Sequence, residues 1–404
     1  MKVTFVNRFF PPDISATSQL LGELVEDLLR MGVNIKVITS NSSYLGGRLS
    51  DTDVYNSENL KIIRISSTSF GRKNILSRYI DFFSFLLLGS ARLFMDDSDI
   101  TVLFTDPPMI SNIGAMNSLI KGKKYIIVLQ DFFPYTAERV GFLKNRLLFS
   151  ILHKNTSYIL KKADAIVSLS ENMADFICSL GVPGDRVRVI HNWADGERIF
   201  PIKKEESKFY NSSDLQNKFV VLYSGNMGVP HEFSTIIDVT ERVQKLGIDN
   251  IIFLFVGDGV KRQEVESIVR EREINNVRFL NYFPKEDLRD SLALADVHLI
   301  TQIESVVGVN MPSKLYGCMA SGRPIIYIGS MKSDVARIIR EADCGFPFGV
   351  GDVNGVYNAI LKLMNDRDLT KNLGENARKY FIDNYDRKIA ANKYYNLLRE
   401  VYES

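Results

Sequence analysis

Two glycine-containing turns in the second half of the chain have residue types that suit a diphosphate. Residues 223–228 read YSGNMG and residues 256–262 read VGDGVKR, and each turn follows an apolar run of strand length. Small residues let backbone N–H groups approach phosphate oxygens, and a following helix N-terminus favours negative charge. The residues expected at this site are Ser224, Gly225, Asn226, Gly257, Asp258 and Gly259, with Lys261 or Arg262 as an added cation. A tight turn needs glycine about as often for its own geometry, so the two turns together weigh more than either alone.

A short segment further along the chain carries a lysine at an unusual place. Residues 312–324 read PSKLYGCMASGRP, with a proline and a serine where a capped helix would begin and a glycine where it would end. Lys314 then lies in the first helical turn, where the helix dipole disfavours cations, so we expect a compensating anion. A diphosphate would supply that anion, and the alternative is a lysine in solvent.

Alternating strands and helices must position these residues. The expected strands are residues 3–7, 35–39, 62–65, 100–104, 125–129, 165–169 and 187–190, then 219–223, 251–256, 277–280, 297–300 and 324–328. Continuous apolar runs of this kind, separated mostly by helix-length segments, predict parallel sheets covered on both faces. We therefore expect an α/β protein with two Rossmann-like, doubly wound parallel-sheet domains. Because ligands bind at the carboxyl ends of such strands, the two domains are expected to face a central cleft.

The domain boundaries follow from length and composition. At 404 residues the chain is too long for one ordinary α/β core. We expect a first domain at residues 1–195, a polar linker at 196–217 and a second domain at 218–386. The last stretch, from about 387 to 404, has aromatic and leucine positions at helical spacing and is expected to pack back on the first domain.

Composition excludes several classes of function. The chain has 50 basic and 48 acidic residues, so its overall field gives no reason to expect nucleic acid as a partner. Its 3 cysteines form no CxxC pair and its 4 histidines are scattered, so no metal is expected. The Asp-x-Asp at Asp51 to Asp53 lies in a polar loop, where a solvated loop is a better interpretation than a manganese site. The N-terminus has no signal-peptide pattern, which predicts a cytoplasmic location.

The run PSKLYGCMASGRPII, residues 312–326, resembles the donor-binding helix of family 4 glycosyltransferases, and it follows SGNMG and VGDG in the order of that family. In the first half, residues 10–13 (FPPD), 30–33 (RMGV) and 190–193 (IHNW) are similar too, so the resemblance covers nearly the whole chain. It implies the two-domain GT-B fold and a retaining sugar transfer from a nucleotide-sugar without a metal. Among members of the family, the chain is similar to bacterial transferases that build O-antigen, capsule and colanic-acid repeat units, including fucosamine transferases.

The resemblance also implies roles for individual residues in the second domain. The donor is expected to be a UDP-sugar, with Pro312, Ser313, Lys314 and Leu315 in its binding site. Ser313 and Lys314, with Lys261 or Arg262, are expected to hold the phosphates, and Tyr282, Phe283 and Pro284 to lie against the nucleobase. Lys314 is expected to be catalytic, because a preorganised cation stabilises the charge that develops on the departing diphosphate.

In the first domain, Asp131 follows the expected strand 125–129 and resembles the polar residue that related enzymes place near the acceptor or the donor sugar. We expect it to be catalytic, and the alternative is a helix or turn cap. The loop from Pro11 to Ser18 is assigned to the acceptor, through Pro12, Ser15, Ala16 and Thr17. Thr17 or Ser18 is expected to cap the next helix.

The chain departs from the family at several positions. Two glutamates commonly lie eight positions apart around the donor-binding helix, where this chain has Val309 and Gly317. Glu304 is a candidate replacement, and its alternative is a surface loop acid. A basic residue that commonly follows the first glycine turn is Asn226 here, and a later lysine position falls near His231.

A basic amphipathic segment suggests a membrane surface. Residues 141–162 read GFLKNRLLFSILHKNTSYILKK and contain no acid. Such a helix can rest on anionic lipid, although a helix that covers the sheet would also show one apolar face. The apolar segment 79–95 is too short and too charged to span a bilayer. Together they motivate a polyprenyl-diphosphate-linked glycan acceptor and a protein on the inner face of the plasma membrane. The resemblance to fucosamine transferases implies an N-acetylated amino sugar such as FucNAc or GlcNAc as the transferred group.

Other functions remain as alternatives. A nicotinamide oxidoreductase needs GxGxxG in the first turn, where residues 7–12 read NRFFPP. A UDP-sugar epimerase shares the two-domain fold, and isomerised nucleotide-sugar without any acceptor would favour it. A nucleotide-sugar-binding subunit without turnover is also consistent with the missing glutamates.

Overall fold

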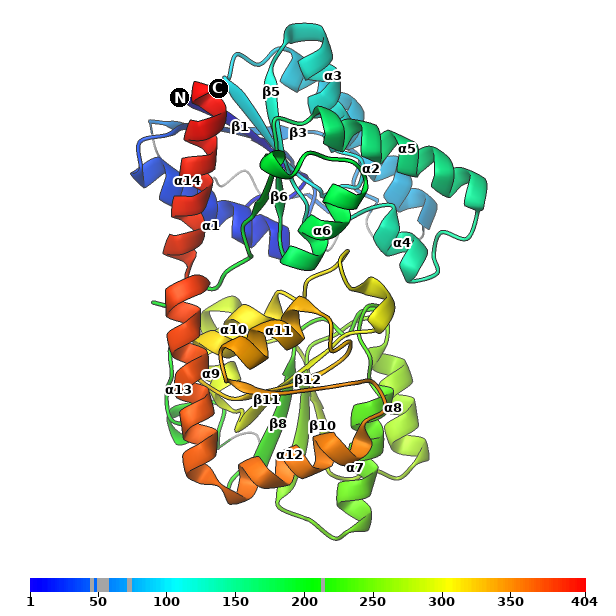
Figure 1. Ribbon diagram of the computed structural model, residues 1–404, viewed down its shortest axis with the longest axis vertical. Coiled ribbons are helices and arrows are strands. Elements are labelled where there is room, and N and C mark those ends of the chain that lie inside the picture. Colours follow the sequence, from blue (N-terminus) through cyan, green and yellow to red (C-terminus); the bar gives the residue numbers. More distant parts are fainter. Residues whose placement is uncertain (44–46, 49–57, 71–74, 212–214) are drawn as a thin grey trace. The chain divides into compact units, whose positions relative to one another are not determined.

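The computed structural model describes residues 1–43, 47–48, 58–70, 75–211 and 215–404. These residues form two compact units, each with its own parallel sheet (Figure 1). Unit 1 contains residues 1–191, 308–310 and 387–404, and unit 2 contains residues 192–307 and 311–386. The helix at the end of the chain therefore belongs to unit 1, and the polar stretch 196–217 is counted in unit 2.

Unit 1 is built on a 7-stranded parallel sheet with the order β3-β2-β1-β4-β5-β6-β7. Its strands are β1 (Lys2–Val6), β2 (Asn34–Ser40), β3 (Leu60–Ile65), β4 (Ile100–Phe104), β5 (Lys124–Val128), β6 (Ala165–Ser168) and β7 (Val187–Val189). Its helices are α1 (Ala16–Arg30), α2 (Ile75–Phe94), α3 (Ser111–Lys121), α4 (Tyr135–Arg139), α5 (Arg146–Lys162), α6 (Glu171–Ser179) and α14 (Arg387–Glu403), with a 3-10 turn at η1 (Gly184–Arg186).

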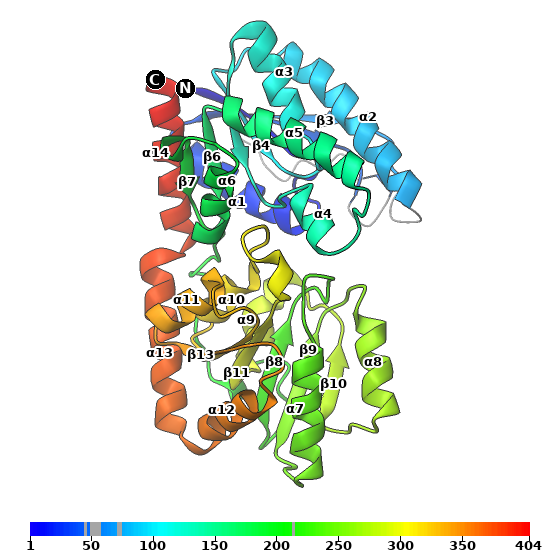
Figure 2. The same ribbon diagram turned by 45° about the vertical axis from the view of Figure 1, so that its right-hand side comes forward.

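The helices of unit 1 form two groups. The chain crosses the sheet in one direction from β1 to β2 and in the other from β4 to β5, so right-handed crossovers place α1 and α3 on opposite faces. α14 packs on α1, whereas α2 packs on α3 and α3 packs on α5 (Figure 2). The reversal of direction lies between β1 and β4, and parallel sheets commonly bind ligands at the carboxyl ends of such strands.

Unit 2 has a 6-stranded parallel sheet with the order β10-β9-β8-β11-β12-β13. Its strands are β8 (Phe219–Ser224), β9 (Ile251–Val256), β10 (Val277–Leu280), β11 (Val297–Thr301), β12 (Ile325–Ile328) and β13 (Gly345–Phe348). Its helices are α7 (Ser234–Lys245), α8 (Arg262–Glu271), α9 (Leu288–Ala293), α10 (Lys314–Ala320), α11 (Asp334–Glu341), α12 (Val353–Asn365) and α13 (Arg367–Asn384), with 3-10 turns at η2 (Lys204–Glu206), η3 (Lys285–Asp287) and η4 (Glu304–Val306). Here the reversal lies between β8 and β11.

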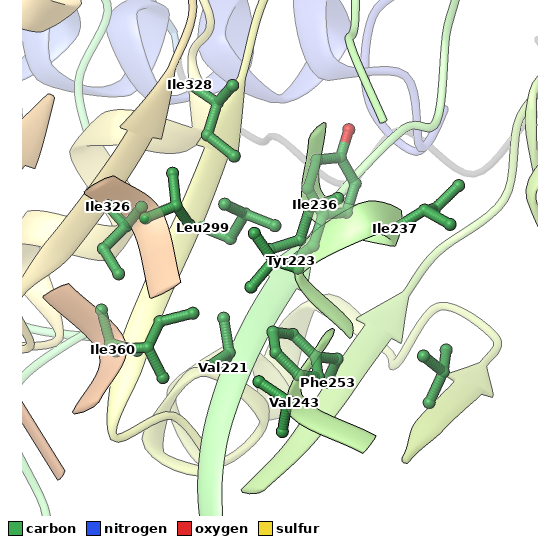
Figure 3. Close-up of a cluster of buried hydrophobic side chains, with 14 of the residues drawn as sticks. Val221, Tyr223, Ile236, Ile237, Val243, Phe253, Leu299, Ile326, Ile328 and Ile360 are labelled. Carbon is green, nitrogen blue, oxygen red and sulfur yellow. The ribbon is translucent and has the colours of Figure 1, made fainter. Parts of the chain in front are cut away.

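Continuous burial explains why these segments form central strands. Every residue of β9, β11 and β12 is buried, and so is every residue of β4 in unit 1. Figure 3 shows one side of the unit 2 core, where Tyr223 and Phe253 from the sheet lie among aliphatic side chains from neighbouring strands and from α7 and α12. The expected parallel α/β architecture is confirmed, and each expected strand lies within two residues of an observed one.

One strand was not predicted. β13 is only four residues long and reads GFPF, with residues that weaken a strand pattern. It forms the edge of the sheet, where Gly345 lies so close to β12 that an added Cβ atom would be 1.8 Å from the Ile325 carbonyl oxygen. Close approach of two backbones, rather than side-chain pattern, therefore defines this strand.

Candidate functional site

The two glycine turns of unit 2 lie side by side at the carboxyl ends of β8 and β9 and hydrogen-bond to each other. Gly225 N donates to Val256 O at 2.9 Å, and Met227 N donates to Asp258 O at 2.8 Å. An added Cβ atom at Gly257 would lie 2.2 Å from Gly225 O, and one at Gly259 would lie 2.5 Å from Met227 O. The contact between the turns thus explains Gly257 and Gly259 without a ligand, and evidence for an anion must come from other groups.

Lys314 supplies that evidence. It is the first residue of α10, and its Nζ atom is buried without a hydrogen-bond partner among the described residues. The Lys314 Nζ atom lies 3.5 Å from the centroid of the Tyr223 ring. It would also lie 3.4 Å from a Cβ atom added at Gly225. Loss of water around the ammonium group lowers the pKa of Lys314 to about 7. A buried cation whose donors are unused is costly, so an anion bound there would stabilise it.

His231 is a second buried titratable group beside this lysine. Its Nδ1 atom lies 2.6 Å from the carbonyl oxygen of Thr301, at the end of β11. A carbonyl only accepts, so Nδ1 carries the proton and Nε2 is left as an acceptor. Burial, together with the charges of Lys314 and Lys261, lowers the pKa of His231 to about 3. The ring is therefore neutral at physiological pH, and of these two groups only Lys314 can carry a positive charge there.

The other expected cations already have partners inside unit 2. Lys261 Nζ donates to His231 O at 2.6 Å. Arg262 Nη1 donates to Gly257 O at 2.6 Å, and its Nε donates to Glu266 at 2.7 Å. These contacts join the start of α8 to the second glycine turn and to the backbone at His231. A direct contact of Lys261 or Arg262 with phosphate stays a prediction, whereas Lys314 has unused hydrogen-bond donors.

The expected nucleobase residues lie beside the second glycine turn. The Tyr282 side chain is 55% exposed, its hydroxyl donates to Asp258 O at 3.2 Å, and its ring edge would be 3.2 Å from a Cβ atom at Gly257. Phe283 instead packs on Phe209, with ring centroids 4.1 Å apart, and Pro284 precedes η3. The structure therefore leaves the ring of Tyr282 accessible next to the turn, and contact with a base stays a prediction.

The start of α10 differs from the expected capped helix. Ser313 occupies the N-cap position but has helical backbone angles, φ −63° and ψ −21°, and its side chain makes no capping hydrogen bond. The expectation of a serine cap was therefore wrong. The side chain of Ser313 is exposed, while Pro312 and Leu315 are buried. The glycine expected at the end of the helix is confirmed, because Gly322 follows the C-cap with φ +66°.

The positions that lack the family's glutamates have different surroundings. An added Cβ atom at Gly317 would meet only Leu292 Cδ1, at 3.6 Å, so the backbone there leaves room for a side chain. Val309 is buried and belongs to unit 1, where its carbonyl oxygen accepts from Thr136 Oγ1 at 3.2 Å. Glu304 is exposed at the start of η4. A replacement role for Glu304 stays a prediction.

In unit 1, carboxylates gather at the carboxyl ends of β1, β4 and β5. Asp131 does not cap α4. Its backbone N–H donates to Thr105 Oγ1 at 3.1 Å, and its side chain is exposed. Asp106, which we did not predict, lies beyond β4 and accepts from Thr17 Oγ1 at 3.2 Å. Burial and then the charge of Asp131 raise the pKa of Asp106 to about 6. Its place just after a buried strand was the available signal.

The expected acceptor loop forms the start of α1. Ser15 caps the helix, because its side chain accepts from Ser18 N at 3.3 Å. The expectation that Thr17 or Ser18 caps this helix was therefore wrong, since the helix begins one residue after Ser15. Ala16 is exposed, Pro12 is partly exposed, and Thr17 contacts Asp106 as described above. Contact of this loop with an acceptor stays a prediction.

The described residues contain neither a cluster of metal ligands nor a membrane-spanning helix. No group of three or more His, Cys, Asp or Glu side chains in this part of the chain could hold a metal ion. The Asp-x-Asp at Asp51 to Asp53 lies outside the described residues. Within the same part of the chain, every helix is too short or too polar to cross a membrane.

Comparison with known proteins identifies the class. Sucrose-phosphate synthase from Thermosynechococcus elongatus superimposes with a TM-score of 0.78 at 14% identity, covering 100% of this chain and 99% of that one. The structure of HepE from Anabaena in complex with UDP and glucose superimposes with a TM-score of 0.73 at 15% identity, covering 99% and 100%. The fold is therefore the GT-B fold of glycosyltransferases.

Sequence comparison identifies the family. Residues 18–198 match the model for glycosyltransferase family 4, and residues 204–380 match the model for glycosyl transferases group 1. The chain is 26% identical to the glycosyltransferase WbjE of Pseudomonas aeruginosa over 297 residues, 73% of each chain. It is 23% identical to the colanic acid biosynthesis glycosyl transferase WcaI of Escherichia coli, covering 89% of this chain and 92% of that one. The protein belongs to the family 4 and group 1 glycosyltransferases and is a glycosyltransferase enzyme.

Proposed function

We propose that this enzyme transfers a sugar from a UDP-sugar to a lipid-linked glycan during synthesis of a bacterial surface polysaccharide. The observation that carries the donor part is the buried, unpartnered Nζ atom of Lys314 beside the interlocked turns at Gly225 and Gly257. A diphosphate is the anion that this arrangement suits, because its negatively charged oxygens would accept hydrogen bonds from the Lys314 Nζ–H groups, which have no other acceptor among the described residues. The complex of HepE with UDP supports uracil as the base.

The chemistry that we propose is transfer with retention of configuration and without a metal. Lys314 would lie next to the departing diphosphate, where negative charge grows as the glycosidic bond to the donor breaks. A cation already in place needs no reorganisation at that moment, so it stabilises the transition state more than the ground state. Asp131 of unit 1 is proposed to contact the sugar or the acceptor hydroxyl, and Tyr282 to contact the base.

The pathway and the acceptor are inferred from relatives and from charge. WcaI is named for colanic acid biosynthesis, and WaaG, whose structure superimposes with a TM-score of 0.69, is named for lipopolysaccharide biosynthesis. A polyprenyl-diphosphate-linked glycan is therefore the acceptor that we propose, with an N-acetylated amino sugar such as FucNAc or GlcNAc as the transferred group. The basic segment 141–162, which contains α5, is proposed to bring the enzyme to the inner face of the plasma membrane.

The decisive experiment has two stages. A panel of nucleotide-sugars is first screened by thermal shift, because a ligand that binds only the folded state raises the apparent melting temperature. The donor that binds is then incubated with a polyprenyl-diphosphate-linked glycan, and release of UDP and the anomeric configuration of the product are measured. Acceptor-dependent UDP release with retention supports the proposal.

Three results would contradict it. Isomerised donor in the absence of acceptor would indicate an epimerase. Saturable donor binding without UDP release would indicate a binding subunit that has lost turnover. Inverted configuration in the product would exclude the retaining mechanism while leaving the transferase class unchanged.

A further inference from the structure

Three neighbouring helices of unit 1 carry large apolar side chains in solvent. α2, α3 and α5 lie in a row (Figure 2), and α3 packs against both of the others. Phe83 and Leu87 of α2, Leu119 and Ile120 of α3, and Leu147 and Ile151 of α5 each expose between 57% and 80% of their surface. Scattered apolar side chains are ordinary on a protein surface, but several large ones on three adjacent helices favour an interaction site. We call this group the apolar row.

The charges on the same helices have a single sign. Among the described side chains, the exposed charged residues of α2, α3 and α5 are Arg92, Lys121, Arg146, Lys154, Lys161 and Lys162. The acid Asp81 of α2 is buried and pairs with Arg8 at 3.4 Å. The whole chain is nearly neutral, at +2, so this bias is local. A second copy docked symmetrically on the apolar row would bring like charges together, whereas an anionic bilayer would match both the apolar and the basic groups.

A groove at the edge of this surface has donors suited to a phosphate. It lies between α5 and α6, has a volume of about 440 Å³, and is lined by Lys154, Ser157, Tyr158, Lys161 and Ser179, among others. Neither lysine has an ionic partner among the described residues. Ammonium and hydroxyl groups are donors, and phosphate oxygens accept strong charge-assisted hydrogen bonds from them.

Local backbone contacts leave these lysines available. The carbonyl groups at the end of α5 are bound by Arg186, whose Nη1 atom lies 3.1 Å from Lys161 O and 3.4 Å from Ala163 O. The lysine side chains are therefore not needed to cap the helix. Gly181, with φ +84°, lies against the Lys161 side chain, and an added Cβ atom would be only 3.0 Å from its Nζ atom. A residue with a side chain at position 181 would crowd this ammonium group.

We propose that the groove between α5 and α6 binds the phosphate of an anionic membrane lipid while the apolar row enters the adjoining bilayer. The inference rests on the proposed membrane role of segment 141–162 and gives it a specific ligand. Tyr158 connects the two parts, because it lines the groove and its side chain is 55% exposed on α5. Amphipathic aromatic side chains of this kind are favoured at membrane–water interfaces. A free phosphate would use the groove alone, whereas a lipid uses both.

The test compares three pairs of charge-removing substitutions, and one apolar pair, L119Q with L147Q, in the full chain. K154Q with K161Q removes the groove cations, R146Q with K162Q removes two cations from the same helix outside the groove, and K379Q with K393Q removes two from α13 and α14. Flotation with vesicles of phosphatidylcholine and phosphatidylglycerol measures bilayer binding. Titration with dihexanoyl-phosphatidylglycerol below its micelle concentration, followed by phosphorus NMR, measures headgroup binding. Inorganic phosphate and a short-chain polyprenyl diphosphate serve as competitors.

We expect K154Q/K161Q to weaken vesicle binding about thirty-fold, from about fivefold for each cation near the surface, and to abolish headgroup binding. R146Q/K162Q is expected to weaken vesicle binding but to retain headgroup binding, and K379Q/K393Q to change neither. L119Q with L147Q is expected to reduce vesicle binding without changing the headgroup titration. The inference fails if R146Q/K162Q and K154Q/K161Q lose headgroup binding equally, or if only the polyprenyl diphosphate binds in the groove.

Thermal shift with UDP is measured on every variant. Normal UDP binding in K154Q/K161Q shows that the variant is folded and that only the lipid site has changed. If the wild-type chain binds vesicles and the phosphatidylglycerol headgroup but no nucleotide-sugar, the proposed donor is wrong and the lipid site stands. If it binds and transfers sugar but shows no headgroup binding, the lipid site is wrong and the proposed enzyme function stands.

Discussion

At the scale of single residues, the strongest expectation concerns Lys314→Ala. Removing the ammonium group should lower kcat by about 100- to 1000-fold, as removal of one preorganised transition-state donor does in other enzymes. The fold should be retained, because the substitution removes a buried cation that has no hydrogen-bond partner among the described residues. Steady-state kinetics with the identified donor, together with a melting curve, check both statements. Lys379→Ala on α13 is the control, and a wild-type kcat in Lys314→Ala would remove this lysine from the mechanism.

Donor affinity should depend on pH through the same group. The pKa of Lys314 is lowered to about 7 by burial, and a bound diphosphate would raise it again. Below pH 7 the lysine is already protonated and donor affinity should be at its highest. Above pH 7 binding requires uptake of a proton, so affinity should fall, by up to about tenfold per pH unit. Calorimetry in buffers of different ionisation enthalpy measures this proton uptake.

The lowered pKa of Lys314 also makes the free energy of unfolding depend on pH. This free energy should rise with pH, whereas donor affinity should fall. The folded protein holds Lys314 less protonated than the unfolded chain between pH 7 and the ordinary lysine pKa of 10.5. The unfolded state then binds more protons, so the contribution of this residue to the free energy of unfolding rises with pH across that window. Lys314→Met should lack both effects. Equal pH profiles for donor binding in wild type and Lys314→Met would show that another group is responsible.

Sequence reasoning found the residues whose unusual position is visible locally and missed those defined by distant contacts. Lys314 was predicted because a cation at a helix start is unfavourable wherever the helix lies. Asp106 was not, because its environment is created by Thr17 and Asp131, which are far away in the sequence. The engagement of Lys261 with His231 O depends likewise on the meeting of two separate turns.

At the scale of elements, substitution of a glycine in the two interlocked turns should have a larger effect on stability and donor binding than substitution of an isolated glycine. Gly257→Ala would place a Cβ atom 2.2 Å from Gly225 O, at φ +134°, so either the turn moves or the backbone is strained. We expect a loss of about 1 to 3 kcal/mol in the free energy of unfolding and weaker donor binding, since the Gly225 turn borders Lys314. Denaturant unfolding and thermal shift with UDP are the measurements.

Gly247→Ala is the matched control for this prediction. Gly247 also has a positive φ, +67°, but an added Cβ atom would meet nothing within 4 Å. It should cost only the left-handed backbone penalty of about 1 kcal/mol and leave donor binding unchanged. Equal losses of stability and equal UDP affinities in the two variants would mean that the contact between the turns has no role.

Strands were the most predictable elements, and helix starts the least. β9 and β11 are buried along their whole length, so their continuous apolar runs identified them without knowledge of the neighbouring strands. β13 was missed because its pairing depends on the absence of a side chain at Gly345, which leaves no hydrophobic pattern. The cap of α1 was assigned to Thr17 or Ser18 instead of Ser15, because several hydroxyl residues adjoin that start and only backbone angles distinguish them.

At the scale of the whole molecule, unit 1 depends on segments from distant parts of the chain. Unit 1 includes α14, which comes after all of unit 2 in the sequence. The buried side chains of α14 include Tyr394, Leu397 and Leu398, and the helix packs on α1. The aromatic and leucine spacing in residues 387–404 indicated a helix with one apolar face. The first domain was expected as the partner of that face, but the particular helix, α1, could not be derived from spacing, because any exposed apolar helix would satisfy it.

Arg387 should control how firmly α14 is held in unit 1. Its Nε atom donates to Asp27 Oδ2 at 2.6 Å and its Nη2 atom donates to Glu23 O at 3.0 Å, and the residue is 7% exposed. Arg387→Met would leave Asp27 buried without its main cation, a change that costs about 3 to 5 kcal/mol when a buried ion pair loses one partner. Hydrogen exchange should therefore accelerate in α1 and α14 and stay unchanged in β8 and β9 of unit 2. Arg399→Met is the control. Within the described part of the chain Arg399 pairs only with exposed Glu403 on the same helix, so its loss should shift stability by less than about 0.5 kcal/mol. Acceleration spread evenly over both units would show instead that the two units unfold as one, and that α14 stabilises the whole chain.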